Sequence, residues 1–171
     1  MKKVLIVIDM QNDFIDMALG TKEAQAIVPN VKAKIGEYQN ESNRIIFTRD
    51  THGDDYLNTA EGKKLPVPHC IKGSKGWQIA DGLYADGCEI IDKPNFGWLG
   101  WDKSGFENSA DYTIEIIGLC TDICVVSNAL IIKTMYTDAK VVVYSACCAG
   151  VTPETHTAAL ETMKMCQIDV I

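Results

Sequence analysis

The cysteine at position 124 is the residue of this chain best placed to act as a nucleophile. It closes the segment 118–124, which follows an apolar run over 112–117 and precedes a stretch over 125–136 with the apolar spacing of a helix. A thiol between a strand and a helix meets the free N–H groups of the first helical turn, which favour negative charge. We therefore expect a lowered pKa for Cys124. The alternative is a thiol buried as a plain apolar side chain.

A carboxylate and an amine, like the thiol of Cys124, each lie shortly after an apolar run of the sequence. Asp9 ends the apolar run over 4–8, and Lys93 follows a short apolar segment over 89–91. The charge of Lys93 can stabilise a thiolate, and Asp9 can accept the thiol proton and later pass it to a leaving amine. Taken singly, Asp9 could be a strand-end cap and Lys93 a solvated charge. Together with Cys124 they form a candidate catalytic set.

A second constellation has the composition of a metal site. Asp50, His52 and His69 offer one carboxylate and two imidazoles, which leave coordination positions open for water or substrate on zinc, iron(II) or manganese. Cys70 is either a further ligand or a buried thiol. His156, early in a late helix, is expected at the surface.

The remaining cysteines predict free thiols. The spacing of Cys120 and Cys124 does not fit a zinc knuckle, and adjacent cysteines such as Cys147 and Cys148 seldom form a disulfide, so we interpret that pair as packed small residues. The count of seven is odd, no signal peptide precedes the first strand, and no apolar stretch approaches 18 residues. We expect a soluble protein of a reducing compartment, the cytoplasm.

Composition narrows the class of partner. The chain has 171 residues, a length typical of one domain, and 47% of them are hydrophobic. A net charge of -7 argues against a general nucleic-acid or membrane binder, each of which needs a basic surface. The first strand is followed by 9–11, Asp-Met-Gln, where a dinucleotide fold would carry glycines, so NAD is not expected as a cofactor. A small molecule is the expected partner.

Strands and helices alternate along the chain, which predicts an α/β fold with a parallel sheet. In such a sheet ligands bind beyond the carboxyl ends of the strands, where Asp9, Asp50, Lys93 and Cys124 fall. Residues 53–74 form a long irregular segment and 95–101 an aromatic loop able to line a pocket. The expected strands are 4–8, 44–48, 89–91, 112–117, 140–145 and 168–171. The expected helices are 27–40, with Pro29 in its first turn, 125–136 and 153–165. Short helical turns are expected at 77–83 and 106–110, and a polar loop at 10–14.

These motifs resemble those of the isochorismatase-like cysteine hydrolases, and within that superfamily the nicotinamidases. The segments that carry the resemblance are 9–14, 48–52, 68–73, 92–93 and 118–125. The resemblance implies one three-layer α/β/α domain over 1–171 with a six-stranded parallel sheet, and Asp9, Lys93 and Cys124 as catalytic triad. It also implies a cis peptide between Leu119 and Cys120, and an oxyanion hole built from the backbone N–H groups of Cys120 and Cys124.

The resemblance further implies that Asp50, His52 and His69 bind a divalent metal, which holds the ring nitrogen of the substrate. Two positions depart from the nicotinamidase pattern: Pro66 stands where a stacking tryptophan is common, and Ile123 stands where some relatives have a polar or aromatic residue. The expected substrate pocket consists of Phe14, Gln11, Phe96, Trp98, Trp101 and Ile123.

The implied reaction is hydrolysis of a small carboxamide through a cysteine thioester. Nicotinamide, giving nicotinate and ammonia in NAD salvage, is the first expectation, with pyrazinamide as an accidental substrate and a homo-oligomer as the expected assembly. A carbamoyl, ureido or other small amide is the alternative; isochorismate is disfavoured because enzymes that cleave it lack the nucleophilic cysteine. Two other classes stay open: a non-haem iron oxygenase built on the Asp-His-His set, and a binding module without catalysis.

Overall fold

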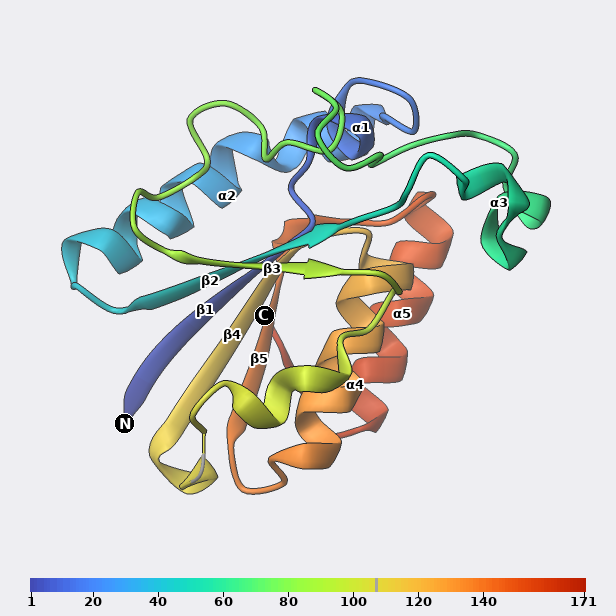
Figure 1. Cartoon of the computed structure of the whole chain (residues 1–171). Coiled ribbons are helices and arrows are strands. Elements are labelled where there is room, and N and C mark those ends of the chain that lie inside the picture. Colours follow the sequence, from blue (N-terminus) through green and yellow to red (C-terminus); the bar gives the residue numbers. More distant parts are fainter. Residues whose placement is uncertain (107) are drawn as a thin grey trace.

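The computed structural model describes residues 1–106 and 108–171 as a parallel sheet with helices on both faces (Figure 1). Six strands lie in the order β3-β2-β1-β4-β5-β6, and each neighbouring pair is parallel. The α/β class and the six-stranded parallel sheet that the sequence predicts are confirmed. The strands are β1 Lys2–Ile8, β2 Arg44–Asp50, β3 Glu89–Lys93, β4 Tyr112–Leu119, β5 Lys140–Ala149 and β6 Asp169–Val170.

The helices divide between the two faces of the sheet. α1 and α2 lie on one face, and α4 and α5 lie side by side on the other, whereas α3 sits beyond the carboxyl ends of the strands (Figure 1). Shorter helical turns connect them, including a π-helical turn over Thr121–Val125 directly before α4. The helices are α1 Asn12–Ile15, α2 Lys22–Asn40, α3 Ala60–Lys64, α4 Val126–Met135 and α5 Pro153–Met165; the 3-10 turns are Tyr56–Asn58, Leu99–Lys103 and Ser109–Asp111.

Burial on both faces explains the unbroken apolar run of β1. Leu5 and Val7 pack into the core beneath α2, whereas Val4, Ile6 and Ile8 pack into the core beneath α4 and α5. Successive side chains of a strand point to opposite faces, so a strand covered on both sides needs apolar residues at every position.

The observed helix α2 begins five residues before the predicted start. Thr21 caps it, because its hydroxyl accepts a hydrogen bond from Ala24 N–H at 3.0 Å. Pro29 therefore lies inside the helix and not in its first turn, so that part of the prediction is wrong.

Residues 77–83 were expected as a short helix and instead pair with the segment after β1. Asn12 N–H donates to the Gln78 carbonyl at 3.0 Å, and Ala80 N–H donates to the Met10 carbonyl at 2.9 Å. These long-range bonds satisfy the backbone without a helix. The expected turn at 106–110 corresponds to the 3-10 turn Ser109–Asp111, and residue 107 lies outside the described residues. The expected loop 10–14 carries α1, and the segment 53–74 carries α3.

The strand order places an opening at the carboxyl edge of the sheet. From β1 the chain continues to β2 and β3 on one side, and it crosses to β4, β5 and β6 on the other. Such a reversal of strand order leaves a crevice between the two halves. Asp9 follows β1, Asp50 ends β2, Lys93 ends β3, and the π-helical turn with Cys124 follows β4. No helix in the described part of the chain is long and apolar enough to span a membrane.

Candidate active site and metal site

Asp9, Lys93 and Cys124 meet at the carboxyl edge of the sheet, as the sequence predicts. Lys93 Nζ lies 2.7 Å from Asp9 Oδ2 and 3.4 Å from Cys124 Sγ. Asp9 and Lys93 are fully buried, and only 4% of Cys124 is exposed. A carboxylate, an amine and a thiol from three distant parts of the chain thus form one buried cluster.

Thr48 and the backbone fix the orientation of Asp9. The Thr48 hydroxyl donates to Asp9 Oδ1 at 2.6 Å and accepts from Asp9 N–H at 3.2 Å. Asp9 has a φ of 46°, an uncommon backbone conformation outside glycine, which turns the chain sharply after β1. Oδ2 is therefore the carboxylate oxygen that faces Lys93. The sequence analysis missed Thr48, whose only signal is its position near the end of β2.

The pKa directions differ from those expected from sequence. Burial, followed by the neighbouring Asp9 carboxylate, raises the pKa of the Cys124 thiol well above its ordinary value, although Lys93 opposes this shift. The prediction of a lowered pKa is wrong because α4 begins only at Val126, and Cys124 lies in a water-excluded turn beside a carboxylate.

Burial also raises the pKa of Asp9, with Lys93 opposing and Asp50 adding to the rise. For Lys93, burial lowers the pKa, but the neighbouring acidic groups, Asp9 foremost and then Cys124 and Asp50, outweigh it and raise the pKa above its ordinary value. The cluster at rest therefore holds a charged amine and a protonated thiol. Asp9 in this setting has a higher proton affinity than an ordinary aspartate, which suits a group that accepts and returns a proton.

The peptide bond between Leu119 and Cys120 is cis, as the resemblance implies. The carbonyl of Cys120 accepts from the N–H groups of Ile123 at 3.1 Å and Val125 at 3.0 Å. These two bonds hold the backbone on either side of Cys124. The turn is thereby closed around the nucleophile.

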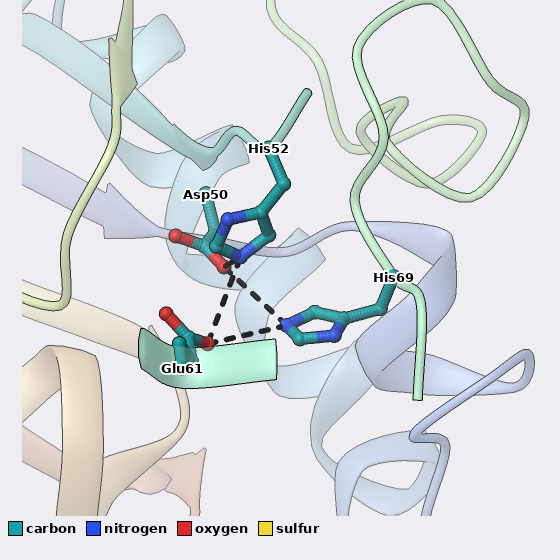
Figure 2. A group of neighbouring side chains, drawn as sticks. All are labelled: Asp50, His52, Glu61 and His69. Carbon is teal, nitrogen blue, oxygen red and sulfur yellow. Dashed lines mark hydrogen bonds and ion pairs between the residues drawn. The ribbon is translucent and has the colours of Figure 1, made fainter. Parts of the chain in front are cut away.

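The predicted metal ligands also meet, and the structure adds a fourth residue to them (Figure 2). His52 Nε2 lies 2.9 Å from Asp50 Oδ2, and His69 Nε2 lies 3.7 Å from the same oxygen. Glu61 Oε1 lies 3.7 Å from His52 Nε2 and 3.8 Å from His69 Nε2. One donor atom from each of the four lies within 4.8 Å of the others. The sequence analysis missed Glu61, which α3 carries from the long segment between the two histidines.

The donor set fits a divalent metal. His69 Nδ1 lies 2.8 Å from the Val67 carbonyl, a contact that places the ring hydrogen on Nδ1 and leaves the Nε2 lone pair facing the carboxylates. Burial tends to raise the pKa of Asp50, but the neighbouring imidazoles of His52 and His69, together with the charge of Lys93, outweigh it and lower the pKa below its ordinary value. Two carboxylates and two imidazoles so oriented are ligands for zinc, iron(II) or manganese.

Gln11 holds the backbone of Asp50 and does not line the pocket. Its side-chain amide donates to the Asp50 carbonyl at 2.9 Å, and its Oε1 accepts from Asp50 N–H at 2.7 Å. The pocket role predicted for Gln11 is therefore wrong, because both ends of this fully buried side chain are used for positioning. Cys70 is a buried thiol of the core beneath α2 and lies outside the metal cluster.

A cavity of about 450 Å³ connects the two clusters. Of the predicted pocket residues, Phe14, Phe96 and Ile123 line it. Its walls are mainly apolar, and Cys124 of the first cluster lines it together with Asp50, Glu61 and His69 of the second. The lining residues are Phe14, Leu19, Asp50, Ala60, Glu61, Lys64, Leu65, His69, Asn95, Phe96, Cys120, Ile123 and Cys124.

Trp98 and Trp101 lie outside this cavity, which corrects their predicted role. The Trp101 ring is fully buried beneath α4, where its Nε1–H donates to Asn128 Oδ1 at 2.9 Å, and Trp98 packs edge-on against it. Asn128 in turn donates to the carbonyls of Cys124 at 2.8 Å and Phe96 at 3.0 Å. This buried amide links the turn Thr121–Val125, which carries Cys124 and is called the nucleophile turn below, to the loop that carries Phe96 of the cavity wall. Asn128 was not predicted from the sequence.

The prediction for Cys147 and Cys148 is confirmed, whereas the prediction for His156 is wrong. Cys147 and Cys148 are buried, as expected, and all seven cysteines are free thiols. His156 is not a surface residue, because it is half-buried and its Nδ1 lies 2.8 Å from Thr121 Oγ1.

A parallel α/β sheet that gathers a thiol, a carboxylate and an amine at its carboxyl edge, beside a metal-binding set, defines a class of proteins suited to cysteine-dependent hydrolysis. The isochorismatase domain family matches residues 3–171, and the chain belongs to this family.

Nicotinamidases are among its curated relatives. A nicotinamidase/pyrazinamidase of Mycobacterium tuberculosis is 25% identical over 99% of this chain and 98% of its own length. A probable inactive nicotinamidase of Arabidopsis thaliana is 30% identical over 94% of this chain and 87% of its own length. Among solved structures, a pyrazinamidase of Pyrococcus horikoshii in complex with zinc is 25% identical, with a TM-score of 0.83 over 100% of this chain and 99% of that chain.

Proposed function

We propose that this protein is an amidohydrolase that converts nicotinamide to nicotinate and ammonia. The observation that carries the proposal is the buried cluster in which Lys93 Nζ lies 2.7 Å from Asp9 Oδ2 and 3.4 Å from Cys124 Sγ. The metal-binding set opens into the same cavity as Cys124, so one small ligand can meet both. Relatives named nicotinamidase, which the chain matches over nearly its whole length, support the choice of amide.

In the first half of the reaction Asp9 accepts the proton of the Cys124 thiol. The sulfur attacks the carboxamide carbon, and the carbonyl electron pair moves onto oxygen, where the backbone N–H groups of Cys120 and Cys124 receive the negative charge. The ammonium of Lys93 favours the sulfur anion while it forms. When the tetrahedral intermediate collapses, Asp9 returns its proton to the nitrogen, the C–N bond breaks, and ammonia leaves a thioester on Cys124.

The second half releases the acid. Asp9, again a carboxylate, removes a proton from a water molecule whose oxygen attacks the thioester carbon. The C–S bond breaks, the sulfur takes the proton from Asp9, and the acid leaves with the original thiol restored and gives up its remaining proton to solvent as nicotinate. The raised pKa of Asp9 suits both directions of proton transfer.

Asp50, His52, Glu61 and His69 would hold the divalent metal, and three of them line the same cavity as Cys124. When bound, such a metal supplies a Lewis acid for the ring nitrogen of the substrate. Zinc is the first candidate, because the Pyrococcus pyrazinamidase structure is described as a complex with zinc. Metal analysis of the protein, purified from cells grown without added zinc, identifies the ion.

Replacement of the nucleophile tests the proposal. Cys124→Ala should lower ammonia release from nicotinamide by at least about 10³-fold, because no covalent intermediate can form. Cys166→Ala is the matched control, because Cys166 is exposed and does not line the cavity, and this variant should keep full activity. Undiminished ammonia release from Cys124→Ala would refute the nucleophile. Absence of release from the parent protein would place it with the inactive relative.

A carbamoyl, ureido or other small amide is the second candidate substrate. Pro66 stands where a stacking tryptophan is common among nicotinamidases, and the cavity of about 450 Å³ leaves room beyond a single ring. A panel of amides assayed for ammonia, each with and without chelator, separates the two. Full activity on an amide without bound metal would favour this candidate over nicotinamide.

We further propose that residues 1–171 act as one catalytic domain in the cytoplasm, as a homo-oligomer. Seven free cysteines and a catalytic thiol support a reducing compartment. Sedimentation of the purified protein tests the assembly.

A further inference from the structure

The nucleophile turn, Thr121–Val125, is anchored by the segment 150–156, which leads into α5 and includes its first turn. Two side chains of Thr121–Val125 reach back to the segment 150–156. The carboxylate oxygens of Asp122 accept from Val151 N–H at 3.2 and 3.1 Å, and Thr121 Oγ1 lies 2.8 Å from His156 Nδ1. These contacts lie on the side of the turn away from the substrate cavity, because neither Thr121 nor His156 lines it.

The Thr121–His156 contact is partly buried and specific. Thr121 is fully buried, so its hydroxyl depends on a protein partner for hydrogen bonding. Gly150 allows the close approach, because a Cβ there would lie 2.9 Å from both Cα and Cβ of His156. Burial lowers the pKa of His156, so its neutral ring keeps one nitrogen as donor and the other as acceptor near pH 7. Either role lets Nδ1 bond to a hydroxyl.

We propose that His156 is a positioning residue for the amide hydrolysis, acting through Thr121 to fix the turn that carries Cys124. This inference rests on the proposed function. Thr121 lies directly after Cys120, whose carbonyl accepts from Ile123 N–H and Val125 N–H. Anchoring the Thr121 side chain therefore anchors both backbone bonds that flank Cys124. The sulfur needs this support because it must stay 3.4 Å from Lys93 Nζ while attacking the substrate.

A double-mutant cycle tests the proposal. Thr121→Val and His156→Leu each remove the hydrogen bond and should each lower kcat by about tenfold, with KM within about twofold, because misplaced sulfur impairs attack and leaves the cavity intact. The double variant should be no slower than the slower single variant, since both changes remove the same bond. The rate constant for alkylation of Cys124 by iodoacetamide should fall with kcat.

Conservative variants separate positioning from plain stability. Thr121→Ser keeps the hydroxyl and His156→Asn keeps a polar group near the place of Nδ1, so both should restore kcat to within about threefold of the parent. Thr157→Val is the control on α5, because among the described residues that hydroxyl bonds to the Pro153 carbonyl of its own helix at 2.9 Å, and its loss should not change kcat.

Three outcomes overturn the inference: unchanged kcat in the single variants, multiplicative losses in the double variant, or a lower melting temperature with kcat per folded enzyme unaltered. If Thr121→Val does not fold, the pair His156→Leu and His156→Asn decides by loss and rescue. If the parent releases no ammonia from any amide, the proposed function fails instead, and the alkylation rates of the same variants still decide whether the bond positions Cys124.

Discussion

At the scale of single residues, burial controls the chemistry of this site more than helix position does. Cys124 and Asp9 both have raised pKa values, mainly because both are withdrawn from water. Lys93 keeps its charge because three acidic neighbours outweigh the cost of burial. The cluster can thus pass one proton between sulfur and carboxylate, while the total charge around Lys93 stays nearly constant.

The raised pKa of Asp9 sets the acid limit of activity. A base must be ionised to accept a proton, so kcat/KM should fall as pH drops through the pKa of Asp9, at a higher pH than the value of about 4 typical of free aspartate. Thr48→Val removes a hydrogen bond that lowers this pKa, so the acid limb should move to still higher pH. The measurement is kcat/KM against pH, with circular dichroism to confirm folding at each point.

An acid limb at or below about pH 4 in the parent would contradict this assignment. A limb that moves to lower pH in Thr48→Val would contradict the role of the hydroxyl.

At the scale of elements, the close approach of β1 and β4 brings Asp9 and the nucleophile turn together. Ile8, the last residue of β1, pairs with Gly118 of β4. Gly118 has a φ of 122°, and a Cβ there would collide with the Ile8 carbonyl oxygen. Glycine is therefore needed for both the backbone conformation and the space at this crossing.

Two glycine substitutions should have opposite effects on stability. Gly118→Ala should lower the free energy of unfolding by about 2 kcal/mol or more, because it strains the backbone and forces β1 and β4 apart. Gly36→Ala is the matched control inside α2, where the added methyl would meet no atom of the described residues within 4 Å beyond its own helix backbone, and it should raise the free energy of unfolding by about 0.5 to 1 kcal/mol. Urea unfolding of both variants measures the difference. Equal effects of the two changes would contradict the role given to Gly118.

At the scale of the whole molecule, the metal-binding set takes its members from the sheet, from α3 and from the segment between β2 and β3. Asp50 belongs to the sheet, His52 follows two residues later, and Glu61 of α3 and His69 belong to the long segment 53–74 (Figure 2). A bound ion would tie this segment to the sheet, and its binding free energy would add to the stability of the folded state.

Zinc should therefore raise the melting temperature of the metal-free protein. At a free concentration of about 100 times Kd the gain is about 2.7 kcal/mol, or roughly 5 to 10 °C for a chain of this size. His69→Asn should abolish the rise, because it removes a ligand. His156→Asn alters the one imidazole outside the cluster and should keep the rise, which differential scanning calorimetry measures. The same rise in both variants would contradict the site.

Much of this molecule followed from local patterns in the sequence. The apolar runs predicted every strand of the sheet, because a parallel sheet covered on both faces needs apolar residues throughout. The polarity of the strands then placed Asp9, Asp50, Lys93 and Cys124 at one edge. The prediction of a helix at 77–83 was wrong, because long-range hydrogen bonds to the segment after β1 satisfy the backbone of these residues instead.

Tertiary structure alone decided which residues distant in the chain are in contact. The sequence by itself determined the fold class, the cluster of Asp9, Lys93 and Cys124, and three of the four residues of the metal-binding set, because periodicity and motif spacing are local properties. Only the folded chain brought Glu61 to the histidines, turned Gln11 away from the pocket toward Asp50, and joined His156 to Thr121. Only burial, which depends on every element packed around the site, reversed the expected pKa of Cys124.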